Sequence, residues 1–294
     1  MTAATTTPSG ITVSGRSTAV TAALIRLVRN TGWLIVSLLV TIALWEAFLH
    51  VYKVPKIIGR SPFDVYHYIF TTKGSQVHKL RSAAGNRKVL FHNLKTTVRD
   101  AAIGYAAGLV LAMAVACAFV LWRAIEQTFM PIALFLRAVP LFAMIPLITL
   151  VCGRDVMAVA VIGGIVCFFP ALVNIMLGLR SATKSSLDLM AVYGASKITT
   201  LRRVLIPSAV PNIFAALKIN VPASVIGALL AEWLATGRGS GNEMLEVINT
   251  FDYGELWSAV VLVTAVSIVA YSIVSAIEAG VLPRFAPDTL RRRA

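Results

Sequence analysis

Long apolar windows separated by shorter polar segments dominate the pattern of this chain. A helix of about 20 apolar residues spans the roughly 30 Å of hydrocarbon in a bilayer. Windows of about this length occur at 33–50, 98–122, 128–151, 156–178, 209–235 and 257–281. The pattern therefore predicts an all-α membrane protein with six transmembrane helices.

Several of these windows contain residues that interrupt or tighten helix packing. Gly104 and Gly108 form a pair of small residues four positions apart, which favours close helix contacts in any bundle. Prolines at membrane depth predict kinks or local breaks, tolerated where the backbone faces protein or a cavity. Such prolines occur at Pro140, Pro146, Pro170 and Pro222.

The polar ends of the chain complete the predicted organisation. Residues 1–17 are rich in Thr and Ser and are predicted to be a disordered tail, and 284–294 form a basic tail. Residues 18–32 carry apolar and Arg side chains on different faces, which predicts an interfacial amphipathic helix. A signal peptide needs an earlier apolar region and a cleavage site of small residues, so 33–50 is expected to be the first span. The transmembrane domain is thus predicted over 33–283.

The longest polar interruption in the second half, Ser181–Pro211, predicts two short helices around a glycine. We expect Ser185 to cap the first helix, with Asp188 three residues later, and Gly194 to end it in the left-handed conformation. The second helix is expected from about Ser196, with Pro207 closing it. The segment is either a docking surface or a helix pair lying on lipid.

Composition sets the class of protein. Apolar residues make up 57% of the chain and charged ones 14%, and the mean hydropathy is +0.79, which indicates a multi-spanning membrane protein. The net charge of +14 does not point to nucleic acid, because the basic residues lie in short segments between apolar windows. The three cysteines lie in apolar segments and are interpreted as packing residues. His67, His78 and His92 lack metal-ligand spacing, so no metal site is expected.

The spacing in Ser181–Pro211 resembles the cytoplasmic EAA loop of ABC importer permeases. Asp188, Leu189 and Met190 stand where that family has Glu-Ala-Ala, and Gly194-Ala195 and Ile206-Pro207 follow at the family's spacing. Further stretches over about 55–280 are similar to the nitrate/sulfonate/taurine branch of type I permeases. These stretches are Ser61–Val65, Arg137–Leu147, Phe168–Pro170, Ala231–Leu234 and Gly237–Gly241.

The resemblance implies the six-helix type I permease fold and a surface that contacts an ATPase subunit. The residues implied for that coupling contact, within the loop 181–207, are Asp188, Leu189, Met190, Ala191, Gly194, Ala195 and Pro207. The chain has no GxxxxGK[ST] phosphate loop, so ATP and Mg are expected on separate ATPase subunits, with no cofactor bound here. The implied partners are a second permease copy in a homodimer or heterodimer, two ATP-binding subunits, an extracytoplasmic substrate-binding protein and lipid.

Arg137 is the charge that bears most on the solute path. A cation in an apolar window is costly unless it pairs, reaches an interface or lines water. It could attract an anionic solute beside Pro140, Met144 and Pro146, or it could pair structurally with a neighbouring helix or reach the cytoplasmic interface. Glu46, Lys218 and Glu232 are interpreted as structural.

Two segments near the predicted outer side complete the picture. Gly237–Gly241 lacks the Lys-Ser/Thr of a phosphate loop and is interpreted as a flexible turn. Residues 243–257 predict an amphipathic outer helix that could receive the binding protein. In the polar segment before the second window, Pro62 is expected at the first position of a helix capped by Ser61.

Together these features predict the permease subunit of an ATP-driven ABC importer of a small anionic solute, without an ATPase site of its own. An ion-coupled secondary transporter should show repeated halves and acid pairs inside the membrane, and a membrane enzyme should show catalytic His or acid sets at that depth. Neither pattern is evident.

Both termini are predicted to be cytoplasmic, in the cell membrane. This topology places the EAA-like loop 181–207 and Arg291–Arg293 inside, as the positive-inside rule prefers. It also places the basic segment 52–97 outside, against the same rule. We retain it because the EAA-like loop must face the cytoplasm.

Overall fold

The computed structural model describes residues 36–55, 57–71 and 83–285. The chain divides into two compact units, Met1–Phe63 and Asp64–Ala294. In the described residues every regular element is a helix, which confirms the all-α prediction. The tail 1–17, the interfacial helix 18–32 and residues 286–294 of the basic tail lie outside the described residues.

The first unit contains the apolar helix Val36–Val51, which coincides with the first predicted window. Its apolar side chains are largely exposed within the unit, as with Leu38 and Val51. The segment that follows the helix folds back on its end, because a Cβ at Gly59 would lie 2.7 Å from Leu49 Cδ2. An apolar helix with exposed side chains is suited to a lipid environment.

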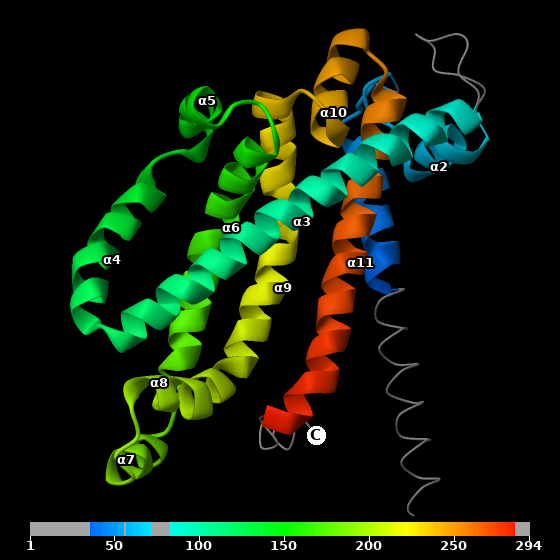
Figure 1. Ribbon diagram of the computed structural model, residues 1–294. Coiled ribbons are helices and arrows are strands. Elements are labelled where there is room, and N and C mark those ends of the chain that lie inside the picture. Colours follow the sequence, from blue (N-terminus) through cyan, green and yellow to red (C-terminus); the bar gives the residue numbers. More distant parts are fainter. Residues whose placement is uncertain (1–35, 56, 72–82, 286–294) are drawn as a thin grey trace, which may run out of the picture. The chain divides into compact units, whose positions relative to one another are not determined.

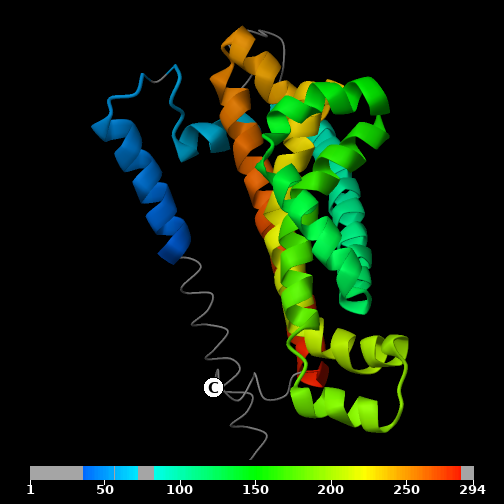
Figure 2. The ribbon, with the colours of Figure 1, turned by 90° about the vertical axis from the view of Figure 1, so that its left-hand side faces the viewer.

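Helix α2 (Pro62–Phe70) contains the boundary between the units, and Pro62 occupies its first position as expected. Four helices in the described residues are long and apolar enough to cross a membrane. They are α3 (Ala83–Leu121), α6 (Val156–Leu179), the run Lys197–Thr236 that contains α9 (Ile206–Ala231), and α11 (Tyr253–Phe285). Helix α6 contacts α3 and α9, and α11 packs on α9 (Figures 1 and 2).

The window 128–151 is not one helix. It divides into α4 (Arg123–Ala138) and α5 (Leu141–Cys152), with Pro140 in an extended conformation between them at φ −60° and ψ 117°. Proline lacks an N–H and disfavours a helical conformation in the residue before it, which explains the break. Kinks or breaks were expected at four prolines, and the chain breaks at Pro140. Pro146, Pro170 and Pro222 lie inside α5, α6 and α9.

Helix α3 begins well before the apolar window at 98–122. Its 39 residues correspond to about 58 Å at 1.5 Å per residue, roughly twice the hydrocarbon thickness. The first turns are polar, and Asn86 within them is fully buried. The prediction of a loop up to residue 97 was thus wrong from Ala83 onward, because tertiary packing rather than hydropathy holds this part of the helix.

Glycines set the close packing of the central helices. A Cβ at Gly104 would lie 2.7 Å from the Cα of Gly163, and one at Gly227 would lie 2.9 Å from the same atom. Backbones of α3, α6 and α9 therefore approach one another at Gly163. The glycine pair at 104 and 108 lies at the α3–α6 contact, since Gly108 also faces Cys167.

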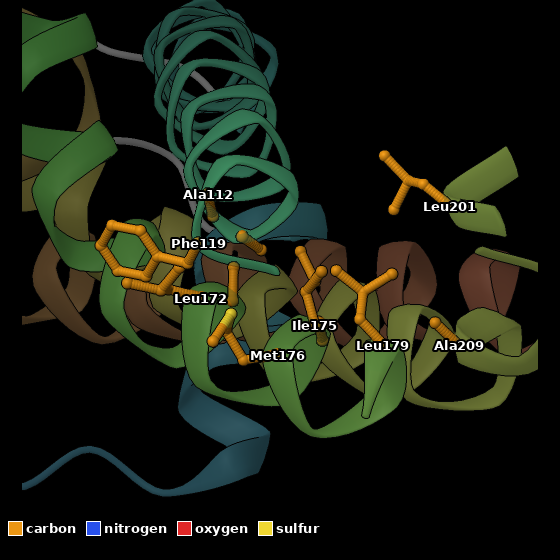
Figure 3. Close-up of a cluster of buried hydrophobic side chains, with 11 residues drawn as sticks. Ala112, Phe119, Leu172, Ile175, Met176, Leu179, Leu201 and Ala209 are labelled. Carbon is orange, nitrogen blue, oxygen red and sulfur yellow. The ribbon is translucent and has the colours of Figure 1, made fainter. Parts of the chain in front are cut away.

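A hydrophobic cluster fills the space between α3, α6 and α9 (Figure 3). It lies toward the end of the bundle that carries α7 (Lys184–Val192) and α8 (Lys197–Thr200) (Figure 1). Phe119 of α3 and Met176 and Leu179 of α6 are nearly fully buried in it. Leu201 joins the cluster from the segment that leads into α9. The core of the bundle thus reaches the base of the polar loop.

Two interhelical ion pairs add to this packing. Glu126 near the start of α4 pairs with Arg180 at the end of α6. Lys218 of α9 pairs with Glu278 of α11, and both side chains are largely buried. The pairing of Lys218 agrees with its interpretation as a structural charge, because a cation inside an apolar helix needs a partner.

Candidate functional site

The loop predicted to contact another subunit forms two short helices that project from one end of the second unit. Helix α7 (Lys184–Val192) and helix α8 (Lys197–Thr200) lie side by side beyond the ends of α6 and α9 (Figure 2). Their arrangement confirms the two helices expected around Gly194. Helices α5 and α10 (Gly239–Thr250) lie at the opposite end of the unit (Figure 1).

The cap of α7 differs from the predicted one. Thr183, not Ser185, is the N-cap, and its side chain accepts a hydrogen bond of 3.3 Å from the Ser186 backbone N–H. The Thr183 and Ser186 hydroxyl groups also contact each other at 2.8 Å. Both Thr183 and Ser185 are residue types that favour N-caps, so local preference does not separate them.

The turn at Gly194 has the predicted left-handed conformation, with φ +61°. Its N–H donates to the Ala191 carbonyl at 3.0 Å, and the Ala195 N–H donates to the Met190 carbonyl at 2.9 Å. These bonds satisfy carbonyl groups at the end of α7. Nothing lies within 4 Å of a Cβ added at Gly194, so the need for glycine is conformational.

The second helix begins as predicted, with Ser196 as N-cap accepting from the Thr199 N–H at 3.2 Å. The prediction that Pro207 closes this helix was wrong. A π-helical segment η1 (Leu201–Leu205) continues α8 directly into α9, and Pro207 lies in the first turn of α9. Hydrogen bonds in this segment run five residues back, as from the Ile206 N–H to the Leu201 carbonyl. This pattern accommodates Pro207, which has no backbone N–H to donate.

Helix α7 has no buried residue, and it presents apolar side chains alongside charged ones. Val192 is 84% exposed and Tyr193 76% exposed. The charged residues of 181–207 are predominantly basic, and Asp188 is the acidic one. They are Lys184, Asp188, Lys197, Arg202 and Arg203. A patch of exposed apolar side chains with charges around it is typical of a protein contact surface.

The base of the loop is fixed to the bundle. The Ser181 hydroxyl group donates to the Gly178 carbonyl at 2.8 Å and contacts the Ser208 carbonyl at 3.3 Å. A Cβ at Gly178 would lie 2.7 Å from Asn212 Cβ, so α6 and α9 meet closely there. The α7–α8 pair is therefore fixed to the bundle where the chain leaves α6 and where it enters α9. A rigid attachment to the spans requires both of these contacts.

The structure places the predicted coupling residues in two groups. Those from Asp188 to Ala195 lie on α7 and the Gly194 turn, in the projecting part, whereas Pro207 lies at its base in α9. Sequence reasoning missed Val192 and Ile198 as exposed apolar residues of the same surface. A signal was present, since each is apolar within a polar loop.

The predicted path residues lie around the α4–α5 break. Arg137 is exposed in the last turn of α4, Pro140 precedes α5, and Met144 and Pro146 lie within α5. Arg137 is eleven residues after Glu126, about 16 Å farther along the helix from the Arg180 pair. Within the described residues Arg137 forms no ion pair.

Among residues 36–55, 57–71 and 83–285, no three His, Cys, Asp or Glu side chains lie close enough together to hold a metal ion. What the described residues offer is a projecting contact surface at one end of the bundle and, toward the opposite end, a helix broken at Pro140 (Figure 1).

Residues 104–286 match the protein family described as "Binding-protein-dependent transport system inner membrane component". Three relatives show the range of the likeness. Formylaminopyrimidine transport permease protein ThiX of Halalkalibacterium halodurans is 25% identical over 69% of this chain and 82% of its own length. A probable ABC transporter permease protein of Haemophilus influenzae is 25% identical over 76% and 88%. Nitrate import permease protein NrtB of Leptolyngbya laminosa is 27% identical over 68% and 72%.

The family match covers more than half of the chain, including α6, the α7–α8 pair and α9. The relatives are permease subunits, and their names show import of different solutes. The match and the four long apolar helices agree on a multi-pass membrane protein. The chain belongs to the family of binding-protein-dependent transport system inner membrane components and is the permease subunit of an ABC importer.

Proposed function

We propose that the α7–α8 pair is the surface through which a separate ATPase subunit drives this permease. The observation that carries the proposal is the projection of a helix with no buried residue, whose apolar side chains Val192 and Tyr193 are exposed. A helix without a hydrophobic contact of its own gains stability by burying that face against a partner. ATP and Mg bind to the partner subunit, which supplies the hydrolysis.

The assembly proposed around this contact has two permease copies, two ATPase subunits and an extracytoplasmic binding protein. We favour a homodimer of permeases. The α7–α8 end then faces the cytoplasm together with both termini, and α10 at the opposite end faces the binding protein (Figure 1). Leu245, Ile248 and Phe251 are exposed at that end and provide apolar contacts for it.

We further propose that the solute is small and anionic. Arg137 supports this, because its exposed side chain lies next to the helix break at Pro140 and forms no ion pair in the described residues. An unpaired cation within a span is retained where it faces water or a solute. Primary selection rests with the binding protein.

Replacing Val192 by Asp is expected to reduce ATPase-subunit recovery at least tenfold when the tagged permease is purified from detergent-solubilised membranes. A charge placed at the centre of an apolar contact loses its hydration without gaining a partner, which costs about 2 kcal/mol or more. Recovery is measured as the amount of ATPase subunit per permease.

The matched control is Ile248→Asp, which makes the same chemical change on exposed α10 at the other end of the unit. It should retain the ATPase subunit. Full recovery with Val192→Asp, or equal loss in both variants, would contradict the assignment of α7 as the contact. Failure of the unaltered permease to capture any ATPase subunit would contradict the proposed assembly itself.

The solute proposal is tested by replacing Arg137 with Gln and, separately, with Lys. Uptake into proteoliposomes of the complete transporter is measured with nitrate, an aliphatic sulfonate and formylaminopyrimidine as probes. For a transported anion, Arg137→Gln should lower the uptake rate about tenfold, the effect of losing about 1.4 kcal/mol of favourable interaction, while Arg137→Lys retains most of it. Uptake of the neutral pyrimidine alone, unaffected by either change, would overturn the anion assignment.

A further inference from the structure

A buried polar network attaches α10 to α3 and to the end of α9. At its centre is Glu232, the first residue of the π-helical segment η2 (Glu232–Thr236), which is fully buried. Its Oε2 atom accepts hydrogen bonds from the Gly241 backbone N–H at 2.7 Å and from the Thr97 hydroxyl group at 3.0 Å. One carboxylate thus joins three helices.

Helix α3 contributes two further contacts to the same network. The Thr97 Oγ1 atom accepts a hydrogen bond of 2.9 Å from the Ser240 backbone N–H. The Asn93 side-chain amide donates to Glu243 Oε2 at 2.6 Å. Because Ser240, Gly241 and Glu243 all lie in the first turns of α10, the network fixes where this helix begins.

The glycines before and within α10 serve this contact and do not form the flexible turn expected from the sequence. Gly237, with φ +63°, ends the preceding helix, whereas Gly239 and Gly241 are buried in the first turn of α10. A Cβ at Gly239, where φ is +84°, would overlap the Glu232 carboxylate. A Cβ at Gly241 would lie 2.6 Å from the Leu229 carbonyl oxygen.

Stability alone does not explain the charges in this network. Asp100 of α3 is fully buried, and the Arg238 Nε atom lies 4.0 Å from its Oδ2. Within the described residues, neither Asp100 oxygen accepts a hydrogen bond, nor does Glu232 Oε1, and Arg238 Nε and Nη2 donate none. Well-packed apolar side chains would be at least as stable as buried charges left incompletely paired.

The spacing of this pair makes it sensitive to the position of α10. A charge-assisted hydrogen bond has a donor–acceptor distance of about 2.7–2.9 Å. Arg238 is the N-cap residue of α10, so a movement of α10 toward α3 by about 1 Å would bring its guanidinium group within bonding distance of Asp100. In the present arrangement the two groups are therefore close but not hydrogen-bonded, and a small shift of α10 would join them.

We propose that Glu232, Thr97 and Arg238 are positioning residues that transmit binding-protein docking on α10 to the spans. Docking moves α10 so that Arg238 bonds to Asp100 of α3. Because Glu232 bonds to both α3 and α10, its carboxylate passes the movement of α10 to α3 and to the outer end of the run Lys197–Thr236. The other end of that run is α8. The inference rests on the proposed function in that α10 receives the binding protein.

The functional test uses the complete transporter in proteoliposomes, with its purified ATPase subunits and binding protein. Thr97→Val removes the hydroxyl group and keeps the side-chain shape, whereas Thr97→Ser keeps the hydroxyl group. Thr97→Val removes a buried hydrogen-bonding group, and Glu232→Gln replaces a charged acceptor with a weaker neutral one. Each should raise the binding-protein concentration for half-maximal ATPase stimulation about tenfold. Basal ATPase activity should be unchanged, and Thr97→Ser should remain within about twofold of the unaltered protein.

The matched control is Asp155→Asn, which makes the same change from carboxylate to amide at an exposed acid that precedes α6 and lies outside both α10 and the network. It should behave as the unaltered transporter. The inference is overturned if Thr97→Val and Glu232→Gln leave the half-maximal concentration unchanged. It is also overturned if they lower basal and stimulated rates in equal proportion, which a purely structural role would do.

A second measurement needs no partner protein. Val247 is 4% exposed on the packed face of α10, so a cysteine placed there should react slowly with N-ethylmaleimide in isolated membranes. Adding Glu232→Gln should raise its labelling rate about tenfold as α10 detaches more often. The permease without the introduced cysteine gives the background from its native thiols.

The two measurements separate the possible failures. Unchanged labelling of the Val247→Cys protein by Glu232→Gln would overturn the attachment of α10 through this network. Faster labelling would support the attachment of α10 through this network. If the same transporter never responds to a binding protein, the proposed function is contradicted, and the transmission step with it.

Discussion

Replacing Gly194 by Val is expected to abolish uptake and ATP-driven coupling while leaving the permease in the membrane. The turn requires φ +61°, a conformation that costs an L-residue about 1–2 kcal/mol and a β-branched one more. No neighbouring atom lies within 4 Å of the added Cβ, so the fold itself is not overpacked. The altered angle of α7 should reduce uptake at least tenfold, measured in proteoliposomes beside the amount of permease in the membrane.

Gly153 offers a matched control for this change. It also has positive φ, at +77°, with nothing within 4 Å of an added Cβ, but it follows α5 rather than α7. With ψ at −169°, Gly153 lies in a region that is essentially restricted to glycine, so Gly153→Val should impose at least as much backbone strain. It should nevertheless cause no loss of ATPase-subunit recovery. If Gly194→Val preserves normal uptake, or if Gly153→Val loses the ATPase subunit equally, the turn has no special part in coupling.

The largest effect on folding is expected from Gly163→Ala. The added Cβ would lie 2.8 Å from the Cα of Gly104, a backbone atom that cannot move without separating α6 from α3. Overpacking of this kind costs about 1–3 kcal/mol, and Gly227 of α9 approaches the same position. We expect a clear loss of thermal stability in detergent, measured as the temperature at which half of the permease precipitates.

The neighbouring glycine provides the control. A Cβ at Gly164 would meet its nearest atoms at 3.7 Å, which is ordinary van der Waals contact. Gly164→Ala should therefore keep a melting temperature close to that of the unaltered permease. Equal stability of the two variants would show that α3 and α6 are not held at the distance described.

Hydropathy and spacing predicted the parts of this structure that depend on local sequence. The four long spans follow from apolar windows, and the left-handed Gly194 turn and the Ser196 cap follow from residue type. The start of α3 could not be predicted in this way. Its polar turns are held by α10 through pairs such as Asn93 with Glu243, which are 150 residues apart in the chain.

The remaining differences have similar physical causes. Thr183 and Ser185 are both good N-caps, so only the finished loop decides which one caps α7. Pro140 breaks its window whereas Pro146, six residues later, lies within a helix, and local rules do not rank the two. The sequence predicted a flexible turn at Gly237–Gly241. The group that requires glycine there is the buried Glu232 carboxylate, which lies in the preceding helix and is not part of the glycine-rich stretch.

The π-helical turn at Leu201–Leu205 fixes the rotational phase between the loop and the span. Successive residues of an α-helix are about 100° apart around its axis. The extra residue in the π-turn therefore rotates the segment before it, which contains α7 and α8, by about that angle relative to α9. Without it, α7 and α8 would leave the axis of α9 on a different side. The direction in which the loop faces its partner therefore depends on one residue in the turn ahead of Pro207.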